Sequence, residues 1–317
     1  MSPGAEGPRR ASLVIGTRGS RLAIWQAEWV QARLKEMAPD LEVSLRRIKT
    51  SGDKILDVPL AKIGGKGLFV KEIEEALIRG EIDLAVHSMK DVPTVLPDSL
   101  DILCVPPRED PRDVLISRES RSLDRLPERS RVGTSSLRRQ AQLLRYRPDL
   151  TIQMLRGNLD TRLRKLKEGE FEALVVAAAG LRRMGWAGEV TEYLPPEISL
   201  PAVGQGALAL EGRRNDAFMR ALVAALEDPA ARTAVTAERA LLERLGGGCQ
   251  VPIAAHGTLE GDTLLLDGLV ASPDGRRLVR DSVRGARSEA HSLGVRLAER
   301  LLAQGADRIL NEIYGTA

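Results

Sequence analysis

The clearest chemical signal in the sequence is a charged pair that directly follows an apolar segment. Residues 82–87 predict a buried strand, and Ser88, Lys90 and Asp91 come just after it. In open α/β folds, ligands bind where the carboxyl ends of parallel strands meet. Lys90 and Asp91 would then form a charged pair in a ligand-binding cleft. The same pair could equally form a surface salt bridge, which contributes little to stability.

Arginines recur at three other junctions where a predicted strand leads into a helix. Backbone N–H groups and hydroxyls form an anion site at such a junction, and a guanidinium pairs with a carboxylate through two hydrogen bonds. Taken singly, each arginine could lie on a solvated helix face. Their recurrence predicts a cleft for a ligand with several carboxylates or phosphates. We expect the cleft to be lined by Arg18, Ser20, Thr134, Ser135, Ser136, Arg138, Arg139, Arg156 and Arg162.

A third feature is a cysteine that follows three glycines at positions 246–248. The helical pattern over residues 232–245 ends at these glycines, so Cys249 is predicted to lie in a loop beyond a helix. It could be a spare thiol, or an accessible attachment point with room for a large group beside the sulfur. The other cysteine, Cys104, lies in the apolar segment 100–105 and is expected to be a buried core thiol.

The elements that must position these residues alternate between strand and helix through most of the chain, which predicts βαβ units around mostly parallel sheets. Proline-rich segments at 106–111 and 195–201 predict two crossings between two similar lobes of a clamshell. From about residue 229, a helix, three alternating segments with turns at 260–262 and 273–275, and a closing helix predict a small α+β domain with an antiparallel sheet. The predicted division is a disordered tail (1–11), a first lobe (12–106 and 202–226), a second lobe (107–201) and a third domain (229–317).

Composition narrows the class of protein. The chain has 317 residues, 43% of them apolar and 29% charged, with a net charge of +3 and a pI of about 9.0. These values are ordinary for a globular protein, and an aromatic content of 3% argues against stacking platforms for single-stranded nucleic acid. We find no membrane span or signal-peptide core, and expect a cytoplasmic protein.

Three further patterns fail as ligand motifs. Residues 64–67 lack the spacing and the hydroxyl residue of a phosphate loop. Residues 204–209 fit a dinucleotide motif, but no clear strand precedes them. The three histidines form no metal-spaced set with the cysteines, so we expect neither a nucleotide nor a metal.

Several of these segments, taken together and in order, resemble the porphobilinogen deaminase (hydroxymethylbilane synthase) family. The resemblance runs almost continuously from Leu13 to the C-terminus. It rests on residues 16–20, 59–69, 85–93, 109–113, 132–139, 155–158, 200–206 and 247–252.

The resemblance implies two lobes like those of periplasmic binding proteins and a third domain that carries a dipyrromethane cofactor on Cys249 through a thioether. It implies a transferase that joins four porphobilinogen molecules head to tail with loss of ammonia, then releases hydroxymethylbilane by hydrolysis, in haem biosynthesis. Asp91 resembles the catalytic aspartate. Its carboxylate would stabilise positive charge on pyrrole nitrogens, by about 4 kcal/mol at ~4 Å and an effective dielectric near 20, and would shuttle a proton to the leaving amine.

The resemblance adds residues to the site and names the partners. Lys62, Ser88, Lys90 and Arg183 join the residues expected to hold the cofactor and substrate carboxylates, and residues 49–66 are a candidate lid, with Lys66 and Phe69. The implied partner is porphobilinogen, without nucleic acid or membrane, and the implied state is a monomer. Two rivals remain: a solute-binding protein, which leaves the Cys249 loop unexplained, and a nucleic-acid binder, for which the arginines are not gathered in one stripe.

Overall fold

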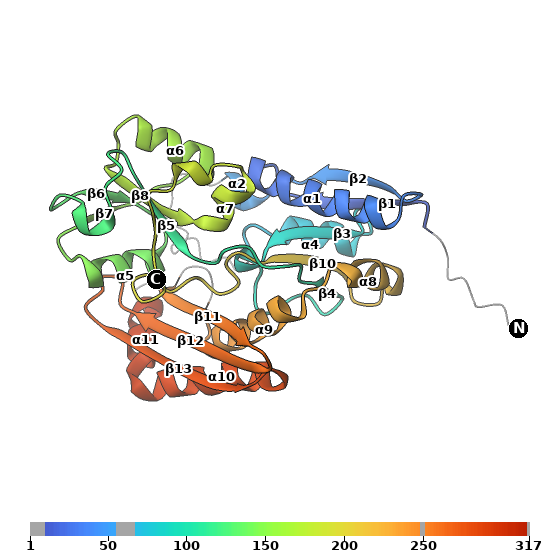
Figure 1. The fold of residues 1–317 in the computed structure, drawn as a ribbon. Coiled ribbons are helices and arrows are strands. Elements are labelled where there is room, and N and C mark those ends of the chain that lie inside the picture. The colour runs from blue at the N-terminus through green and yellow to red at the C-terminus, as the bar shows by residue number, and fades with distance from the viewer. Residues whose placement is uncertain (1–9, 55–66, 248–250, 316–317) are drawn as a thin grey trace, which may run out of the picture.

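The computed structural model describes residues 10–54, 67–247 and 251–315, which fold around three sheets (Figure 1). The first sheet has the strand order β2-β1-β3-β10-β4. Its strands are β1 (Ser12–Thr17), β2 (Glu42–Arg47), β3 (Leu84–Ser88), β4 (Leu100–Cys104) and β10 (Leu208–Arg213). The helices joined to it are α1 (Arg21–Met37), α2 (Ser51–Lys54), α4 (Lys71–Ile78) and α8 (Ala217–Val223), with short turns η1 (Met89–Asp91) and η4 (Ala224–Leu226).

The second sheet has the order β7-β6-β8-β5-β9, which repeats the plan of the first. Its strands are β5 (Asp113–Ser117), β6 (Arg131–Gly133), β7 (Thr151–Gln153), β8 (Ala173–Ala177) and β9 (Glu192–Tyr193). Its helices are α5 (Leu137–Tyr146), α6 (Leu159–Lys167) and α7 (Ala178–Arg183), with η2 (Leu123–Arg125) and η3 (Ala187–Glu189).

Both sheets are mostly parallel, as predicted, but each contains one strand of opposite direction. In the first sheet β10 runs antiparallel to β3 and β4, and in the second β5 runs antiparallel to β8 and β9. Each of these is the strand that follows a crossing between the lobes. Local sequence patterns predict that a strand exists but not its direction, which depends on how the chain returns to the sheet.

The third sheet is antiparallel and lies below the other two in Figure 1. It consists of β11 (Ile253–Glu260), β12 (Thr263–Ala271) and β13 (Leu278–Ala286), with turns where the sequence predicts them. Its helices are α9 (Pro229–Arg244), α10 (Ala290–Leu301) and α11 (Asp307–Gly315), with η5 (Arg287–Glu289) and η6 (Leu302–Ala306). Leu241, Leu266 and Leu297, all fully buried, join α9, β12 and α10 in one core.

The two crossings are hydrogen-bonded to each other. Nε of Arg108 donates to the carbonyl of Gln205 at 2.8 Å, and Nε2 of Gln205 donates to the carbonyl of Pro111 at 2.7 Å. Gly206 has a φ of +88°, and a Cβ there would lie 2.2 Å from the carbonyl oxygen of Glu109. Only glycine allows this close approach. The two crossings are therefore packed and hydrogen-bonded against each other, and do not act as two independent linkers.

The third sheet is tied to these crossings by the buried carboxylate of Glu238 on α9. It accepts from Arg108 Nη1 at 2.6 Å, from the Gly204 N–H at 2.7 Å and from the Gly257 N–H on β11 at 2.8 Å. A fully buried carboxylate needs such partners, because an unpaired one would carry a large desolvation cost.

The start of the described chain is anchored. The predicted tail includes Arg10 and Ala11, yet Arg10 pairs with Asp83 at 3.2 Å and Asp216 at 2.8 Å, and the Ala11 carbonyl accepts from Glu42. These contacts hold both residues on the first sheet; residues 1–9 of the predicted tail lie outside the described residues. Within the described ranges, no helix combines the length and the apolar character needed to cross a membrane.

Candidate active site

Asp91 is positioned at the carboxyl end of β3 by the short turn η1. The N–H of Met89 donates to the carbonyl of Ala207 at 3.0 Å, and the N–H of Val92 returns to the carbonyl of Met89 at 3.1 Å. The Met89 side chain is 1% exposed and anchors the turn in the core. Asp91 itself is partly exposed, as a proton-transferring group must be to reach a ligand.

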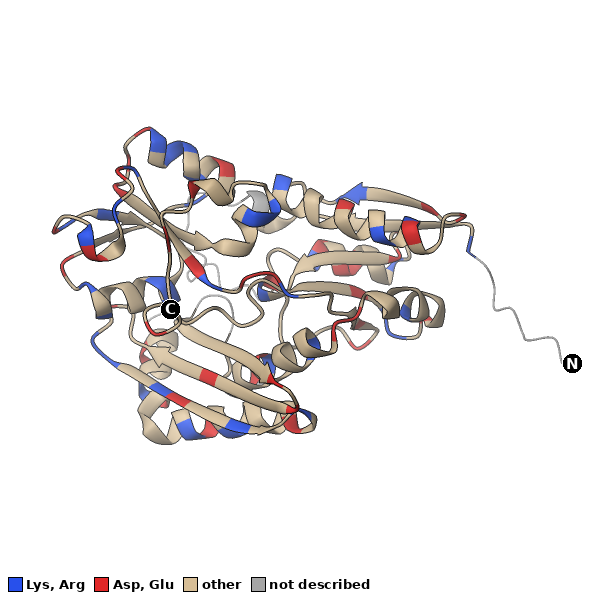
Figure 2. Ribbon diagram, viewed as in Figure 1, with Lys and Arg blue, Asp and Glu red and all other residues tan. Residues whose placement is uncertain are grey.

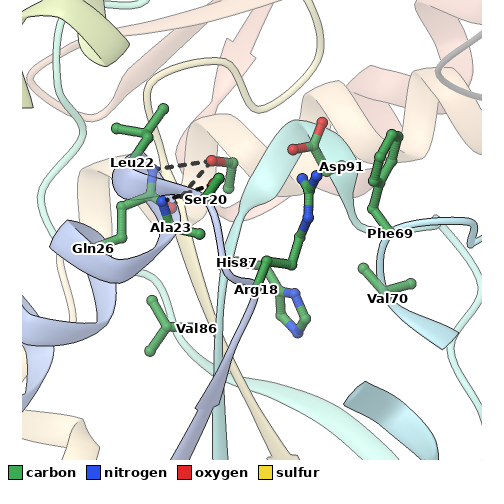
Figure 3. A pocket seen from close by; sticks show the side chains of 11 residues that line it. Arg18, Ser20, Leu22, Ala23, Gln26, Phe69, Val70, Val86, His87 and Asp91 are labelled. Atoms are coloured by element: carbon green, nitrogen blue, oxygen red, sulfur yellow. Dashed lines mark hydrogen bonds between the residues drawn. The ribbon is translucent and has the colours of Figure 1, made fainter. Parts of the chain in front are cut away.

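Asp91 lines a cavity of about 70 Å³ with Arg18, Ser20, Phe69 and Ser88 (Figure 3). The Arg18 guanidinium carbon lies 4.3 Å from the centre of the Phe69 ring, a cation–π contact. Figure 3 shows this guanidinium and the Asp91 carboxylate extending toward the same part of the cavity. The pairing of β1 with β3 brings these residues together across the sheet.

The serines of this cavity already have structural partners. The Ser20 hydroxyl accepts from the N–H of Ala23 at 3.2 Å and so caps α1. The Ser88 hydroxyl accepts from Nε2 of Gln26 at 3.0 Å. Gln26 is a residue that the sequence analysis missed; its position on the core face of α1 is the signal that could have found it.

A second set of cations is electrostatically coupled, and two of them, Lys90 and Arg162, also interact with Asp91. Burial, and next the charge of Arg139, lowers the pKa of Lys90 to about 8. Burial, followed by the charges of Arg139 and Arg156, lowers the pKa of Arg162 to about 10. In both cases the Asp91 carboxylate opposes the shift. Cations that lower each other's pKa values repel one another. An anionic ligand bound among them would stabilise their charged forms.

Arg138 and Arg139, at the start of α5, are 4% and 6% exposed. Their guanidiniums share the fully buried carboxylate of Asp113: Nη1 of Arg138 lies 2.7 Å from Oδ2, and Nη2 of Arg139 lies 2.8 Å from Oδ1. Burial alone would raise the pKa of Asp113, but these two charges hold it well below its usual range. Both arginines were predicted ligands, whereas no local pattern gave a role to the carboxylate that they share.

The hydroxyl residues before α5 shape the turn that delivers these arginines. The Thr134 hydroxyl accepts from the Ser136 N–H at 3.2 Å, and the Ser136 hydroxyl caps α5 by accepting from the Arg139 N–H at 3.4 Å. Ser135, between them, is partly exposed. Two of the three predicted hydroxyl ligands are therefore engaged in the turn itself.

The remaining predicted arginines lie in different places. Nε of Arg162 donates to the carbonyl of Gly157 at 2.9 Å, and burial lowers the pKa of the nearby Arg156. Arg183 is 9% exposed and donates to the carbonyl of Gly206 at 2.6 Å, so it lies at the second crossing. Burial lowers the pKa of Arg183 to about 10.

Three predicted residues, Lys62, Lys66 and Cys249, lie outside the described residues. The helix before Cys249 ends as predicted. Gly246, at φ +66°, donates to the carbonyl of Glu243, and Gly247 donates to that of Leu242, which together form a Schellman cap. The other cysteine, Cys104, is fully buried, which confirms its predicted place in the core.

The helix α9 is held against the Asp91 segment. Nη1 of Arg239 donates to the carbonyl of Val92 at 3.0 Å, and Nη2 donates to that of Pro93 at 2.6 Å. These acceptors follow Asp91 directly in the chain. The helix that precedes Cys249 is thereby fixed to the segment that carries the candidate catalytic residue.

A buried acidic cluster beneath the cavity was also missed. Nε2 of His87 lies 2.9 Å from Oε2 of Glu211, close enough for an ion pair although the atoms are not aligned as a hydrogen bond. Burial, and next the charge of Glu211, raises the pKa of the neighbouring Glu74 to about 7. The sequence gives no local signal for this cluster, because its members come from α4, β3 and β10.

Figure 2 shows Lys and Arg on all three parts of the molecule, interspersed with Asp and Glu. The described basic residues are not gathered in a single stripe. Three of the predicted arginines, Arg138, Arg139 and Arg183, are buried.

Fold and site together define a two-lobed protein with a third domain, in which Arg18 and Asp91 line one cavity at the carboxyl ends of the parallel strands β1 and β3. Two family models match the chain: "Porphobilinogen deaminase, dipyromethane cofactor binding domain" over residues 13–221, and "Porphobilinogen deaminase, C-terminal domain" over residues 232–303. The chain belongs to the porphobilinogen deaminase family. It is therefore a transferase that polymerises porphobilinogen in tetrapyrrole biosynthesis, and its cofactor is dipyrromethane.

Individual relatives agree over nearly the whole chain. Porphobilinogen deaminase from Geobacter metallireducens is 58% identical over 302 residues, 95% of each chain. The enzyme from Syntrophotalea carbinolica is 59% identical over 300 residues, again 95% of each chain. Among solved structures, the periplasmic aliphatic sulphonate binding protein SsuA from Escherichia coli is 16% identical, over 74% of this chain and 70% of that chain, with a TM-score of 0.40. A likeness at that level supports no further argument.

Proposed function

We propose that Asp91 is the catalytic residue of this transferase and that the surrounding cations hold the carboxylates of cofactor and substrate. The observation that carries the proposal is the cavity in which the Arg18 guanidinium and the Asp91 carboxylate extend toward the same space (Figure 3). Lys90 and Arg162, whose pKa values are lowered by burial and by neighbouring cations, also interact with Asp91. Such a cluster favours a ligand with several negative charges, and each pyrrole unit of porphobilinogen carries two carboxylates.

The donor set fits a dipyrromethane. Guanidiniums bind carboxylates through paired hydrogen bonds, and the cations coupled to Lys90 and Arg162 outnumber the carboxylates there. We expect Arg18, Lys62, Arg138, Arg139, Arg156 and Arg162 to hold its acetate and propionate groups, with help from the hydroxyl residues and Lys90, and Cys249 to carry it. When bound, the dipyrromethane supplies the pyrrole carbon to which the next unit is joined.

Asp91 has two tasks in this proposal. As a carboxylate it stabilises the positive charge that develops on the substrate pyrrole nitrogen when the amine leaves. Its oxygen also carries a proton to the departing ammonia and accepts one when the new carbon–carbon bond is complete. Arg18, stacked on Phe69, holds the substrate end of the cavity in place.

The test replaces Asp91 by alanine and measures both turnover and intact mass. We expect turnover to fall by at least ~10²-fold while the cofactor stays attached, because the charge and the proton carrier are both lost. Asp98→Asn is the matched control, since Asp98 is exposed and a few residues further along the same loop. Near-normal turnover in Asp91→Ala would remove Asp91 from the mechanism.

We further infer that the protein acts as a cytoplasmic monomer and that its domains divide near residues 106, 201 and 229. The distribution of strands among three sheets supports the division. Sedimentation at several concentrations tests the monomer, and a rise in mass with concentration would contradict it.

A further inference from the structure

The carboxylate of Asp113 contacts both buried arginines of α5. Oδ2 accepts from Nη1 of Arg138 at 2.7 Å, and Oδ1 accepts from Nε and Nη2 of Arg139 at 3.0 and 2.8 Å. Asp113 is fully buried, and both arginines are almost fully buried. Two guanidiniums therefore share a single carboxylate. Arg138, Arg139 and Asp113 together keep a net positive charge, which water screens little because the three side chains are buried.

The same carboxylate also contacts the second crossing between the lobes. Oδ2 accepts from the Ser199 hydroxyl at 2.7 Å, and Oδ1 accepts from Nε2 of Gln205 at 2.9 Å. Asp113 itself is the first residue of β5, directly after the first crossing. It thus links the two arginines to both crossings at once.

Each guanidinium is further fixed by a backbone carbonyl. Arg138 Nη1 donates to Leu200 at 2.6 Å, and Arg139 Nη1 donates to Val175 at 3.2 Å. With donors held on two sides, neither side chain can change rotamer without breaking several charge-assisted hydrogen bonds. The positive charge of Arg139 nevertheless acts on Lys90 and Arg162, because it contributes to the lowered pKa values of both side chains.

We propose that Asp113 is a positioning residue for the carboxylate-binding site: it holds Arg138 and Arg139 in place before ligand arrives and fixes them to the crossings between the lobes. This inference rests on the proposed function, in which those arginines bind cofactor and substrate carboxylates. A preformed site binds more tightly, since the ordering of its side chains does not have to be completed on binding. Asp113 does not contact the reacting atoms in this account.

The experiment compares Asp113→Asn with Asp110→Asn, both produced in a cofactor-competent host. Asparagine keeps the shape but leaves two buried guanidiniums without a counter-charge, so we expect them to separate. The expected result is a fraction of cofactor-loaded protein, read by intact mass, that falls severalfold, and a KM for porphobilinogen in the loaded fraction that rises about tenfold with kcat changed less than threefold. Asp110 pairs with Arg112 at 2.7 Å outside this cluster, so Asp110→Asn should match the wild type.

A second variant covers the case in which Asp113→Asn does not fold. Ser199→Ala removes a single hydrogen bond to Asp113 without changing charge, and should raise KM about threefold at unchanged kcat. Ser130→Ala is its control, because Ser130 is also buried and its hydroxyl donates to the carbonyl of Pro127 at 2.7 Å, away from Asp113.

The outcomes separate this inference from the proposed function. A loaded fraction and KM equal to wild type in folded Asp113→Asn, or in Ser199→Ala if the first variant does not fold, would overturn the positioning role while the function stands. Wild-type protein that carries no adduct would instead overturn the function on which the inference rests.

Discussion

Lys90 and Arg139 lie in different lobes, yet the charge of Arg139, next after burial, lowers the pKa of Lys90 to about 8. Lys90 follows β3 of the first sheet, and Arg139 lies on α5 of the second. The proposed cationic site therefore draws on residues of both lobes.

The first prediction concerns pH. A lysine with a pKa of about 8 loses its charge as the pH rises through 8, so its attraction for substrate carboxylates is lost on the alkaline side. We expect the KM for porphobilinogen to rise severalfold between pH 7 and 9.5. Lys90→Arg should abolish this rise, because a guanidinium keeps its proton throughout that range.

A KM that stays flat to pH 9.5 in the wild-type enzyme would contradict the role given to Lys90. An identical rise in Lys90→Arg would assign the titration to another group.

The second prediction concerns the ring beneath Arg18. Phe69→Leu removes the cation–π contact at 4.3 Å but keeps an apolar side chain, and should raise KM about threefold to fivefold, corresponding to about 0.5–1 kcal/mol. Phe69→Tyr preserves the ring face and should behave like the wild type. If leucine and tyrosine give the same KM, the contact does not position Arg18.

The third prediction concerns assembly of the holoenzyme. Arg138→Leu leaves Asp113 with less counter-charge and removes a guanidinium expected to bind cofactor carboxylates, so most of the protein should be recovered without cofactor. Arg145→Leu, on the exposed side of the same helix, should be fully loaded. Intact mass spectrometry measures both, and normal loading of Arg138→Leu would return Arg138 to a structural role.

The residues around Asp113 also show how far the sequence could predict this site. Positions at strand ends, such as Asp91, Arg138 and Arg156, are visible in the sequence because strand and helix patterns are local. The hydrogen bond between Asp113 and Gln205 joins the first residue of β5 to the second crossing, and no local pattern indicates it. Local patterns do not predict the directions of β5 and β10 either, because these depend on the path of the chain between the lobes.

The fourth prediction concerns stability. Burial, and next the charge of Glu211, raises the pKa of Glu74 from 4.5 to about 7. Between those values the folded state binds a proton that the unfolded state has released, so this group's contribution to the free energy of unfolding falls as the pH rises from 4.5 to 7. Glu74→Gln should therefore stabilise the protein by about 1–2 kcal/mol at pH 8, after allowance for solvent screening, and by little at pH 4.5.

Denaturant unfolding at the two pH values measures the difference. Glu75→Gln is the neighbouring control, because its partner is the exposed Arg79 at 3.6 Å. A Glu74→Gln variant that is less stable than the wild type at pH 8 would mean that the ionised carboxylate is favourable where it lies.

The most direct test of the central claim, that this cleft builds a chain on a cofactor carried by Cys249, is the intact mass of the purified protein before and after brief exposure to porphobilinogen. We predict a covalent adduct of dipyrromethane size, absent in Cys249→Ser, followed by a ladder of added units that does not form in Asp91→Ala. A wild-type mass equal to the bare sequence, from a host able to make the cofactor, would contradict the account.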